Sequence, residues 1–193
     1  VEISLILASI YPENTVSSGS FYAVSRVVHW RKFACLFPLG KTLAAFDNRD
    51  MSTVFEKIIS GEFSGRFVWA DDSCVALATI EPTSPGHVLV VPRDPIPSWT
   101  QLDPQECTHL MEVAQIIGRA QERAFGVERS GLVIAGFEVP HTHLHVIPLR
   151  TESDVLLNNA APASSEELDA AIEKLREAVV ALGYGTEVPP QMA

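Results

Sequence analysis

One short segment, residues 140–148, constrains the fold and the chemistry of this chain more than any other. Its sequence is PHTHLHVIP, and it holds three of the six histidines, at every second position. Side chains of an extended strand alternate between its two faces, so His141, His143 and His145 are predicted to share one face. Thr142, Leu144 and Val146 then share the other face, which indicates a half-buried strand packed on a core.

Three imidazoles on one face admit three interpretations. Neutral imidazoles could hold a metal ion, as they do in three-histidine zinc sites. One imidazole could instead be a nucleophile, while its neighbours steady it and bind an anion. The third interpretation makes the histidines an ordinary solvated face of the strand. The pattern alone does not decide among a metal site, a nucleophile and a polar surface.

Composition describes one globular domain and excludes some partners. The chain has 193 residues, of which 47% are hydrophobic and 20% charged, typical of a soluble globular protein. Its net charge of −10 argues against a general nucleic-acid binder, which would carry a basic face. We also expect no membrane partner. The three cysteines lack C-x-x-C spacing and indicate reduced thiols in a cytoplasmic protein: Cys35, Cys74 and Cys107.

The first fifty residues differ from the rest of the chain. Residues 1–50 show no sustained helical or strand period, and the apolar run at 3–10 is too short to span a bilayer. We interpret residues 1–50 as an extension that is either disordered or mis-annotated. The functional domain is then expected at 51–150, followed by a C-terminal helical extension at 151–193.

Helix signals are clear beyond Met51. Thr53 and Glu56 form a capping-box pattern that opens a short helix. Asp103 followed by Pro104 opens a long amphipathic helix that ends at Gly126. A last amphipathic helix is predicted from Ser164 to Gly183, and the tail after Tyr184 is expected to be loose.

Strand signals complete the expected fold. Apolar or alternating runs bounded by turn residues predict strands at 66–70, 74–78, 87–91 and 132–135, before the histidine segment. Short loops join most of these runs, which favours antiparallel pairing. The predicted class is α+β: an antiparallel sheet of about five strands, one long helix, a short N-terminal helix and an extra C-terminal helix.

The pattern His-x-His-x-His followed by two apolar residues resembles the signature of the histidine triad (HIT) family. The resemblance extends over 52–149. Residues 53–59 (TVFEKII) are similar to the family's opening helix, and 85–92 (PGHVLVVP) to its strand with a fourth histidine. The branch that the chain resembles most is the Hint-type proteins, homodimeric purine nucleotide phosphoramidases. Such a homodimer would form through the long helix and the adjacent strand.

The resemblance implies a mechanism without metal or cofactor. His143 would attack the α-phosphorus of a purine nucleotide conjugate, either a phosphoramidate or a dinucleoside polyphosphate. Water would then hydrolyse the nucleotidyl-histidine, so that two easier steps replace one hard step. His141 would support the nucleophile, while His145 and His87 would bind the non-bridging oxygens and stabilise charge in the transition state.

The resemblance also suggests a binding site for the nucleoside, with departures from the family pattern. Phe55, Ile58 and Ile80 would line an apolar slot for the base. Thr79 stands where the family usually has an acidic residue for the ribose, and Glu138 where a polar residue contacts the phosphate or the leaving group. These departures keep two alternatives open: a nucleotide-binding protein with little turnover, and a three-histidine metal protein.

Overall fold

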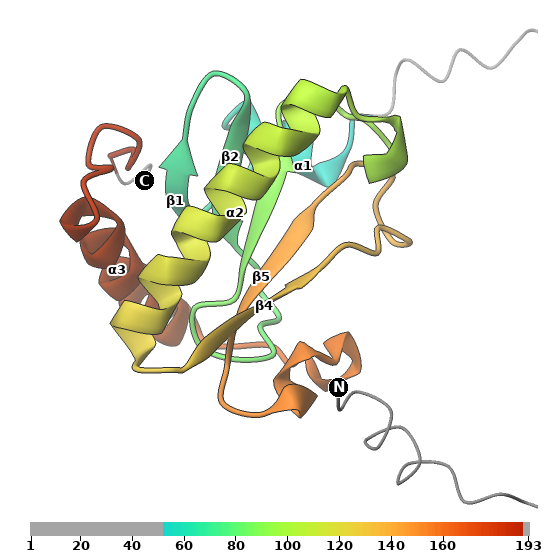
Figure 1. The fold of residues 1–193 in the computed structure, drawn as a ribbon. Helices are drawn as coiled ribbons and strands as arrows, with labels where there is room; N and C mark the ends of the chain where they lie inside the picture. Colours follow the sequence, from blue (N-terminus) through green and yellow to red (C-terminus); the bar gives the residue numbers. More distant parts are fainter. Residues whose placement is uncertain (1–51, 191–193) are drawn as a thin grey trace, which may run out of the picture. The chain divides into compact units, whose positions relative to one another are not determined.

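The computed structural model describes residues 52–190 as an α+β fold around one antiparallel sheet. The sheet has five strands in the order β1-β2-β3-β5-β4, so the histidine strand lies between β3 and β4 (Figure 1). This confirms the predicted class. The expectation for residues 1–50 lies outside the described part of the chain. The strands are β1 (Phe67–Ala70), β2 (Cys74–Ala78), β3 (Val88–Pro92), β4 (Arg129–Val133) and β5 (Leu144–Leu149).

The three α-helices are α1 (Val54–Ile59), α2 (Pro104–Phe125) and α3 (Ser165–Ala181), and short 3-10 turns lie at Trp99–Gln101, Glu152–Val155 and Leu157–Asn159. Their starts follow from local chemistry, because side-chain oxygens accept hydrogen bonds from otherwise unpaired N–H groups of the first turn. The predicted capping boxes of α1 and α3 are both formed, and the Asp103 carboxylate caps α2. None of the helices in residues 52–190 is long and apolar enough to cross a membrane.

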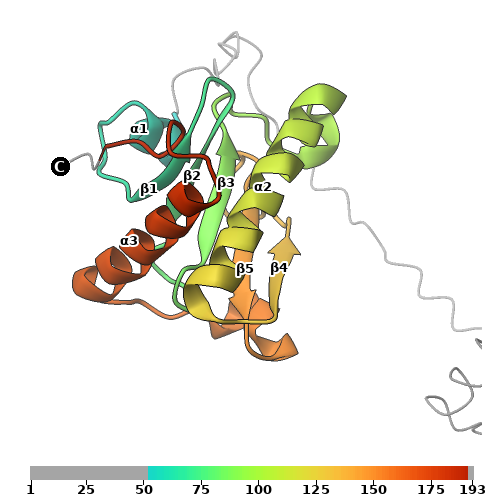
Figure 2. The same cartoon turned by 60° about the vertical axis from the view of Figure 1, so that its left-hand side comes forward.

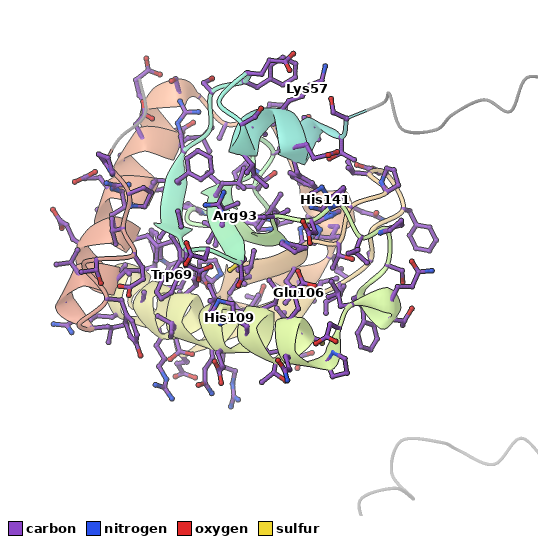
Figure 3. The ribbon with its side chains drawn as sticks, turned by 90° about the horizontal axis from the view of Figure 1, so that it is seen from above. Lys57, Trp69, Arg93, Glu106, His109 and His141 are labelled. Carbon is purple, nitrogen blue, oxygen red and sulfur yellow. The ribbon has the colours of Figure 1, made fainter. Side chains whose placement is uncertain are left out.

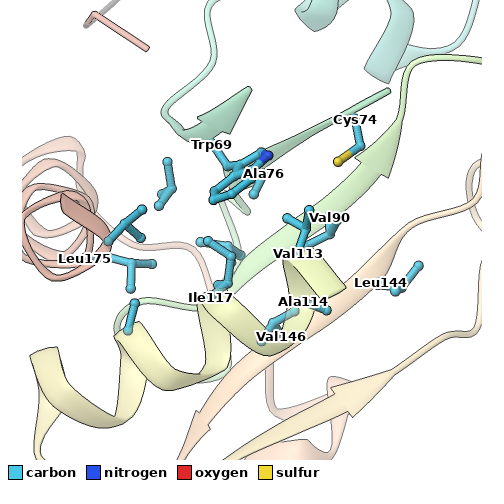
Figure 4. Close-up of a cluster of buried hydrophobic side chains, with 14 of the residues drawn as sticks. Trp69, Cys74, Ala76, Val90, Val113, Ala114, Ile117, Leu144, Val146 and Leu175 are labelled. Atoms are coloured by element: carbon cyan, nitrogen blue, oxygen red, sulfur yellow. The ribbon is translucent and has the colours of Figure 1, made fainter. Parts of the chain in front are cut away.

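Helices cover both faces of the sheet. α2 and α3 pack on one face, where the main apolar core forms, while α1 covers a smaller apolar cluster on the other face (Figures 1 and 2). Figure 4 shows Leu175 of α3 in this main core together with Ile117 of α2 and Trp69 of β1. The sequence that follows the histidine strand therefore contributes to the same core as the sheet.

Two predicted strands are displaced. β4 begins at Arg129 rather than near Leu132, and β5 begins at Leu144, after the first two histidines of the triad. β4 is an edge strand whose residues are exposed or half-buried, so apolar periodicity marks it poorly. Only His145 of the three triad histidines lies in the regular strand, and the expectation of one continuous histidine strand is wrong.

The expectation of a loose tail is also wrong for the described part of it. The N–H of Ala70 in edge strand β1 donates to the carbonyl of Glu187 at 2.8 Å. The Tyr184 ring packs against Trp69 with 5.5 Å between ring centroids, and the Arg176 guanidinium donates to the carbonyl of Pro189. The tail thus covers an edge that would otherwise present unpaired backbone groups.

Candidate active site

Four histidines lie along β3 and β5, on the face of the sheet that α1 covers. His141 and His143 lie in the segment that enters β5, His145 in β5, and His87 directly before β3. Ring centroids are 5.0 Å apart for His143 and His145 and 5.2 Å apart for His87 and His145. In Figure 3, His141 lies beside α1, whereas the unrelated His109 lies on α2. The structure therefore brings together all four histidines that the sequence singled out.

His143 is held with one ring nitrogen available. Its Nδ1 lies 2.8 Å from the carbonyl oxygen of His141. Because a carbonyl only accepts, Nδ1 must carry the hydrogen, and the neutral ring then has its lone pair on Nε2. The buried Phe55 ring packs against the imidazole at 5.1 Å between centroids. The arrangement presents Nε2 as a nucleophile with a fixed direction.

His141 is fully buried, and its backbone carbonyl accepts the hydrogen bond from His143. Its Nε2–H donates to the carbonyl of Pro92 at 2.8 Å, and its Nδ1 lies 2.9 Å from the Thr53 hydroxyl, which donates to it. Burial lowers the pKa of His141, so the ring is neutral. The same Thr53 oxygen caps α1. Sequence reasoning identified Thr53 as a cap but missed this second role, because nothing in the local pattern marks it.

His87 and His145 form a directed chain of hydrogen bonds. The backbone N–H of Thr83 donates to His87 Nδ1 at 3.2 Å, so the hydrogen of neutral His87 is on Nε2. That nitrogen lies 3.0 Å from His145 Nδ1 and donates to it. His145 must then carry its own hydrogen on Nε2, where it can be donated to an anion. The backbone N–H of Thr83 thus sets the tautomer of His87, which in turn sets the tautomer of His145.

This geometry revises the role expected for His87. Both of its ring nitrogens are engaged within the protein, with Thr83 and with His145. His87 therefore cannot donate to a phosphate oxygen while these two hydrogen bonds are formed. His145 is the histidine whose N–H is available to an oxyanion, and His87 orients it.

The remaining predicted residues differ in how close they lie to the histidines. Phe55 contacts both His141 and His143, and Ile58 packs in the same apolar cluster. The Thr79 N–H donates to the carbonyl of His87, and its hydroxyl accepts from the N–H of Glu81. Ile80 and Glu138 have exposed side chains, and across residues 52–190 no hydrogen bond joins either to the four histidines. The structure thus places Phe55 at the site and leaves Ile80 and Glu138 at its margin.

Backbone hydrogen bonds join the segment before α3 to the loop beside this site, which the sequence did not predict. The N–H groups of Ala161 and Ala163 donate to the carbonyls of Pro82 and Ile80. These carbonyls belong to the loop that carries Thr83, the donor to His87. The signal was absent because main-chain bonds between loops leave no side-chain pattern.

The hydrogen bonds also bear on the metal interpretation. They engage both nitrogens of His87 and of His141 and one nitrogen of His143 and of His145. Among residues 52–190, two ring nitrogens of these histidines have no partner: Nε2 of His143 and Nε2 of His145. A three-histidine metal site needs three, so the formed network does not fit one.

Elsewhere in the described residues, one group has donor atoms within 4.8 Å of one another: Asp71, Cys74 and His109. Burial would raise the pKa of Asp71, but hydrogen bonds led by that from Trp69 bring it to about 2. Burial and the Asp71 charge raise the pKa of the Cys74 thiol, which keeps its hydrogen and points it at Asp71. His109 Nε2 lies 2.9 Å from the same carboxylate. These contacts make the group a satisfied structural cluster.

Comparison with known proteins agrees with the fold. The model of the HIT domain family matches residues 60–152. An uncharacterised HIT-like protein of Methanocaldococcus jannaschii is 30% identical over 128 residues, which are 64% of this chain and 98% of that protein. The chain therefore belongs to the histidine triad family, as its sequence indicated.

Two relatives carry named activities, and one solved structure is similar in fold. The asymmetrical bis(5'-nucleosyl)-tetraphosphatase of Schizosaccharomyces pombe is 31% identical, over 60% of this chain and 65% of that protein. Adenylylsulfatase HINT3 of Arabidopsis thaliana is 32% identical, over 53% of this chain and 54% of that protein. A zinc-bound histidine triad family protein of Mycobacterium smegmatis has a TM-score of 0.60 and 26% identity, covering 70% of this chain and 98% of that one.

The paired histidines make stability depend on pH. Burial, with the neighbouring histidine adding to it, lowers the pKa of His87 from 6.5 to about 3 and that of His145 to about 4. The unfolded chain therefore binds protons below pH 6.5 that the folded chain does not, so this stability is present above pH 6.5 and is lost towards pH 4. We expect a loss of about 1 to 2 kcal/mol per histidine by about pH 5.

Urea unfolding at several pH values measures this dependence. His87→Gln removes one of the two titrating groups while keeping an amide that can donate to His145. We expect its stability to fall less steeply with pH than that of the unmodified protein. An equal slope in both proteins would show that His87 does not contribute.

Proposed function

We propose that this protein is a nucleotide hydrolase or transferase that acts at the α-phosphate of a purine nucleotide conjugate through a nucleotidyl intermediate on His143. The observation that supports it most is the hydrogen bond from Nδ1 of His143 to the His141 carbonyl, which leaves Nε2 as a free nucleophile. His145 lies next to it with its Nε2–H available as a donor.

The first chemical step forms one bond and breaks one. The lone pair of His143 Nε2 attacks the α-phosphorus, the bond from phosphorus to the leaving group breaks, and its electron pair departs with that group. Nδ1 keeps its hydrogen and donates it in a hydrogen bond to the His141 carbonyl. This bond stabilises the positive charge that develops on the ring. The Nε2–H of His145 is placed to donate to a phosphate oxygen as charge builds up on it.

The second step releases the nucleotide. Water attacks the same phosphorus, the bond from phosphorus to nitrogen breaks, and the neutral imidazole is regenerated while a proton from water is lost to solvent. Because the burial that lowers the pKa of His145 keeps that ring neutral near pH 7, it retains one donor and does not become a second cation beside the nucleotidyl-imidazolium.

The nucleoside is proposed to lie along the α1 face of the sheet. The buried Phe55 ring and Ile58 offer an apolar surface for a purine. The Thr79 hydroxyl accepts one hydrogen bond from Glu81 and still has a hydrogen to donate to a ribose oxygen. Glu138 is exposed and would act on the leaving group only after its loop moves inward.

A panel of conjugates tests the proposal. It contains adenosine and guanosine phosphoramidates, diadenosine tetraphosphate and adenylyl sulfate, the last two chosen because relatives are named for these activities. We expect release of a purine mononucleotide from at least one class. Binding of adenosine monophosphate with no release from any conjugate would overturn the enzymatic proposal.

That outcome would favour a second candidate function, a nucleotide-binding protein with little turnover. The specific observation in its favour is Thr79, whose single hydroxyl is already engaged with Glu81 and cannot supply the two acceptor oxygens of a carboxylate. Calorimetric titration with mononucleotides separates the two functions, because binding without release belongs to the second alone.

We also propose a homodimer and a reducing compartment. The outer face of α2 and β4 exposes Met111 and Leu132, which flank a concavity of about 450 Å³. A second copy packing there would cover these apolar side chains, and light scattering would give the mass of a dimer. Cys74 and Cys107 are free thiols, which fits the cytoplasm.

A further inference from the structure

Gln121 is a fully buried polar residue of α2 that reaches the main chain of both histidine-bearing segments. Its Nε2 lies 2.9 Å from the carbonyl oxygen of Gly86 and 2.8 Å from that of Val146. Gly86 directly precedes His87, and Val146 directly follows His145. One amide group thus joins the two segments whose histidines form the hydrogen-bonded pair.

The sheet has a specific need for this amide. The paired register of β3 and β5 ends at Val88 and Val146, and Gly86 lies in the turn just before β3. The Pro148 carbonyl accepts from the Ser84 hydroxyl, so this residue turns its backbone groups towards the same loop. Proline has no N–H to donate, and within residues 52–190 no backbone N–H donates to the Gly86 carbonyl. Gln121 supplies the missing hydrogen.

The amide is held in one orientation at a cost. Both contacts of Nε2 are carbonyl oxygens, which only accept, so the –NH2 group must face them. The Oε1 atom is buried and has no hydrogen-bond partner in the described part of the chain. An unpaired buried acceptor is unfavourable. The two hydrogen bonds that Nε2 donates offset this cost.

A second contact fixes the same loop one helical turn further along α2. Gly86 has φ +88°, and a Cβ there would lie 2.2 Å from the Phe125 ring. The loop and the Phe125 side chain therefore approach more closely than a residue with a Cβ at position 86 would allow. The same loop carries the Thr83 N–H that donates to His87. α2 thus holds the donor loop from the opposite side of the sheet.

We propose that Gln121 is a positioning residue that keeps His87 and His145 aligned, and so holds the Nε2–H of His145 towards the phosphate. Without it the Gly86 carbonyl is unpaired and the loop can shift. The bond from His87 to His145 Nδ1 is then no longer enforced, and His145 can carry its hydrogen on Nδ1 instead. The expected loss of turnover rests on the proposed function, whereas the expected change in the tautomer of His145 does not.

The test replaces Gln121 with Met, which has similar length and no donor, in the full chain. Nitrogen-15 spectra of labelled histidine report the tautomer of His145 without any substrate. We expect a single Nε2–H form in the unmodified protein and a mixture in Gln121→Met. With a substrate from the panel, kcat should fall about 10- to 100-fold with little change in KM, because the lost donor acts on the transition state.

Rescue and a matched control separate positioning from packing. The Pro148 carbonyl contacts Ser84 of the same loop, and Pro148→Val gives residue 148 a backbone N–H for the Gly86 carbonyl. The double variant Gln121→Met with Pro148→Val should therefore regain the Nε2–H form and most of kcat. Gln105→Met changes an exposed glutamine of the same helix and should alter neither. If Gln121→Met does not fold, the double variant is compared directly with the unmodified protein and Pro148→Val.

Three outcomes overturn the inference: a single Nε2–H form in Gln121→Met, mixed tautomers in the double variant, or equal effects of Gln121→Met and Gln105→Met. The inference and the proposed function can fail separately. A shifted tautomer in a protein that hydrolyses nothing would leave the inference standing and remove the proposed function. An unshifted tautomer in an active protein would do the reverse.

Discussion

His143→Ala is expected to lose turnover of the responsive conjugate by about 10⁴-fold or more, because it removes the nucleophile of the covalent route. Binding of the mononucleotide should persist, since Phe55 and the Nε2–H of His145 remain in place. The measurement is release of mononucleotide, with calorimetric titration of the product on the same preparation.

A histidine outside the site is the matched control for this variant. His109 lies on α2 and contacts Asp71, so His109→Ala should keep turnover near that of the unmodified protein. Circular dichroism confirms that both variants are folded. Residual activity of His143→Ala within about tenfold of the unmodified protein would contradict a covalent role for this residue.

Leu175→Ala is expected to destabilise the whole folded unit by about 2 to 5 kcal/mol, the usual cost of removing a buried leucine side chain. Leu175 is 0% exposed and packs in the same core cluster as Ile117 of α2 and Val90 of β3. We infer from this packing that α3 belongs to the domain that contains the histidines. Urea unfolding followed by tryptophan fluorescence, to which Trp69 contributes, measures the loss.

The control for this prediction lies on the same helix. Val180 of α3 is 52% exposed, so Val180→Ala should change the unfolding free energy by no more than about 0.5 kcal/mol. A loss below about 1 kcal/mol for Leu175→Ala would mean that α3 is only loosely attached. Such a result would favour an independent C-terminal extension over a shared core.

Much of the fold was predictable because its signals are local. The caps of α1, α2 and α3 depend on side chains within four residues, and all three formed as expected. β4 was displaced because an edge strand with exposed side chains shows little apolar periodicity. The tail beyond Tyr184 was mistaken for loose chain because its main-chain bond to Ala70 has no sequence signal.

The site was predictable in composition but not in detail. The spacing of the histidines identified His141, His143 and His145, whereas His87 and Phe55 followed from the resemblance to the family. The tautomers depend on main-chain partners of the rings: the carbonyls of His141 and Pro92, and the N–H of Thr83. Loop conformation sets where these groups lie, so no side-chain pattern marks them. Gln121 was missed for the same reason, because it donates only to carbonyls.

The stereochemical course at phosphorus tests the central claim most directly. A conjugate whose α-phosphorus carries sulfur in one known configuration would be hydrolysed in ¹⁸O-enriched water, and the configuration of the product determined. Attack by His143 followed by attack of water inverts the configuration at phosphorus twice, so we expect overall retention. Overall inversion would show a single direct attack by water and would contradict the nucleotidyl-histidine intermediate.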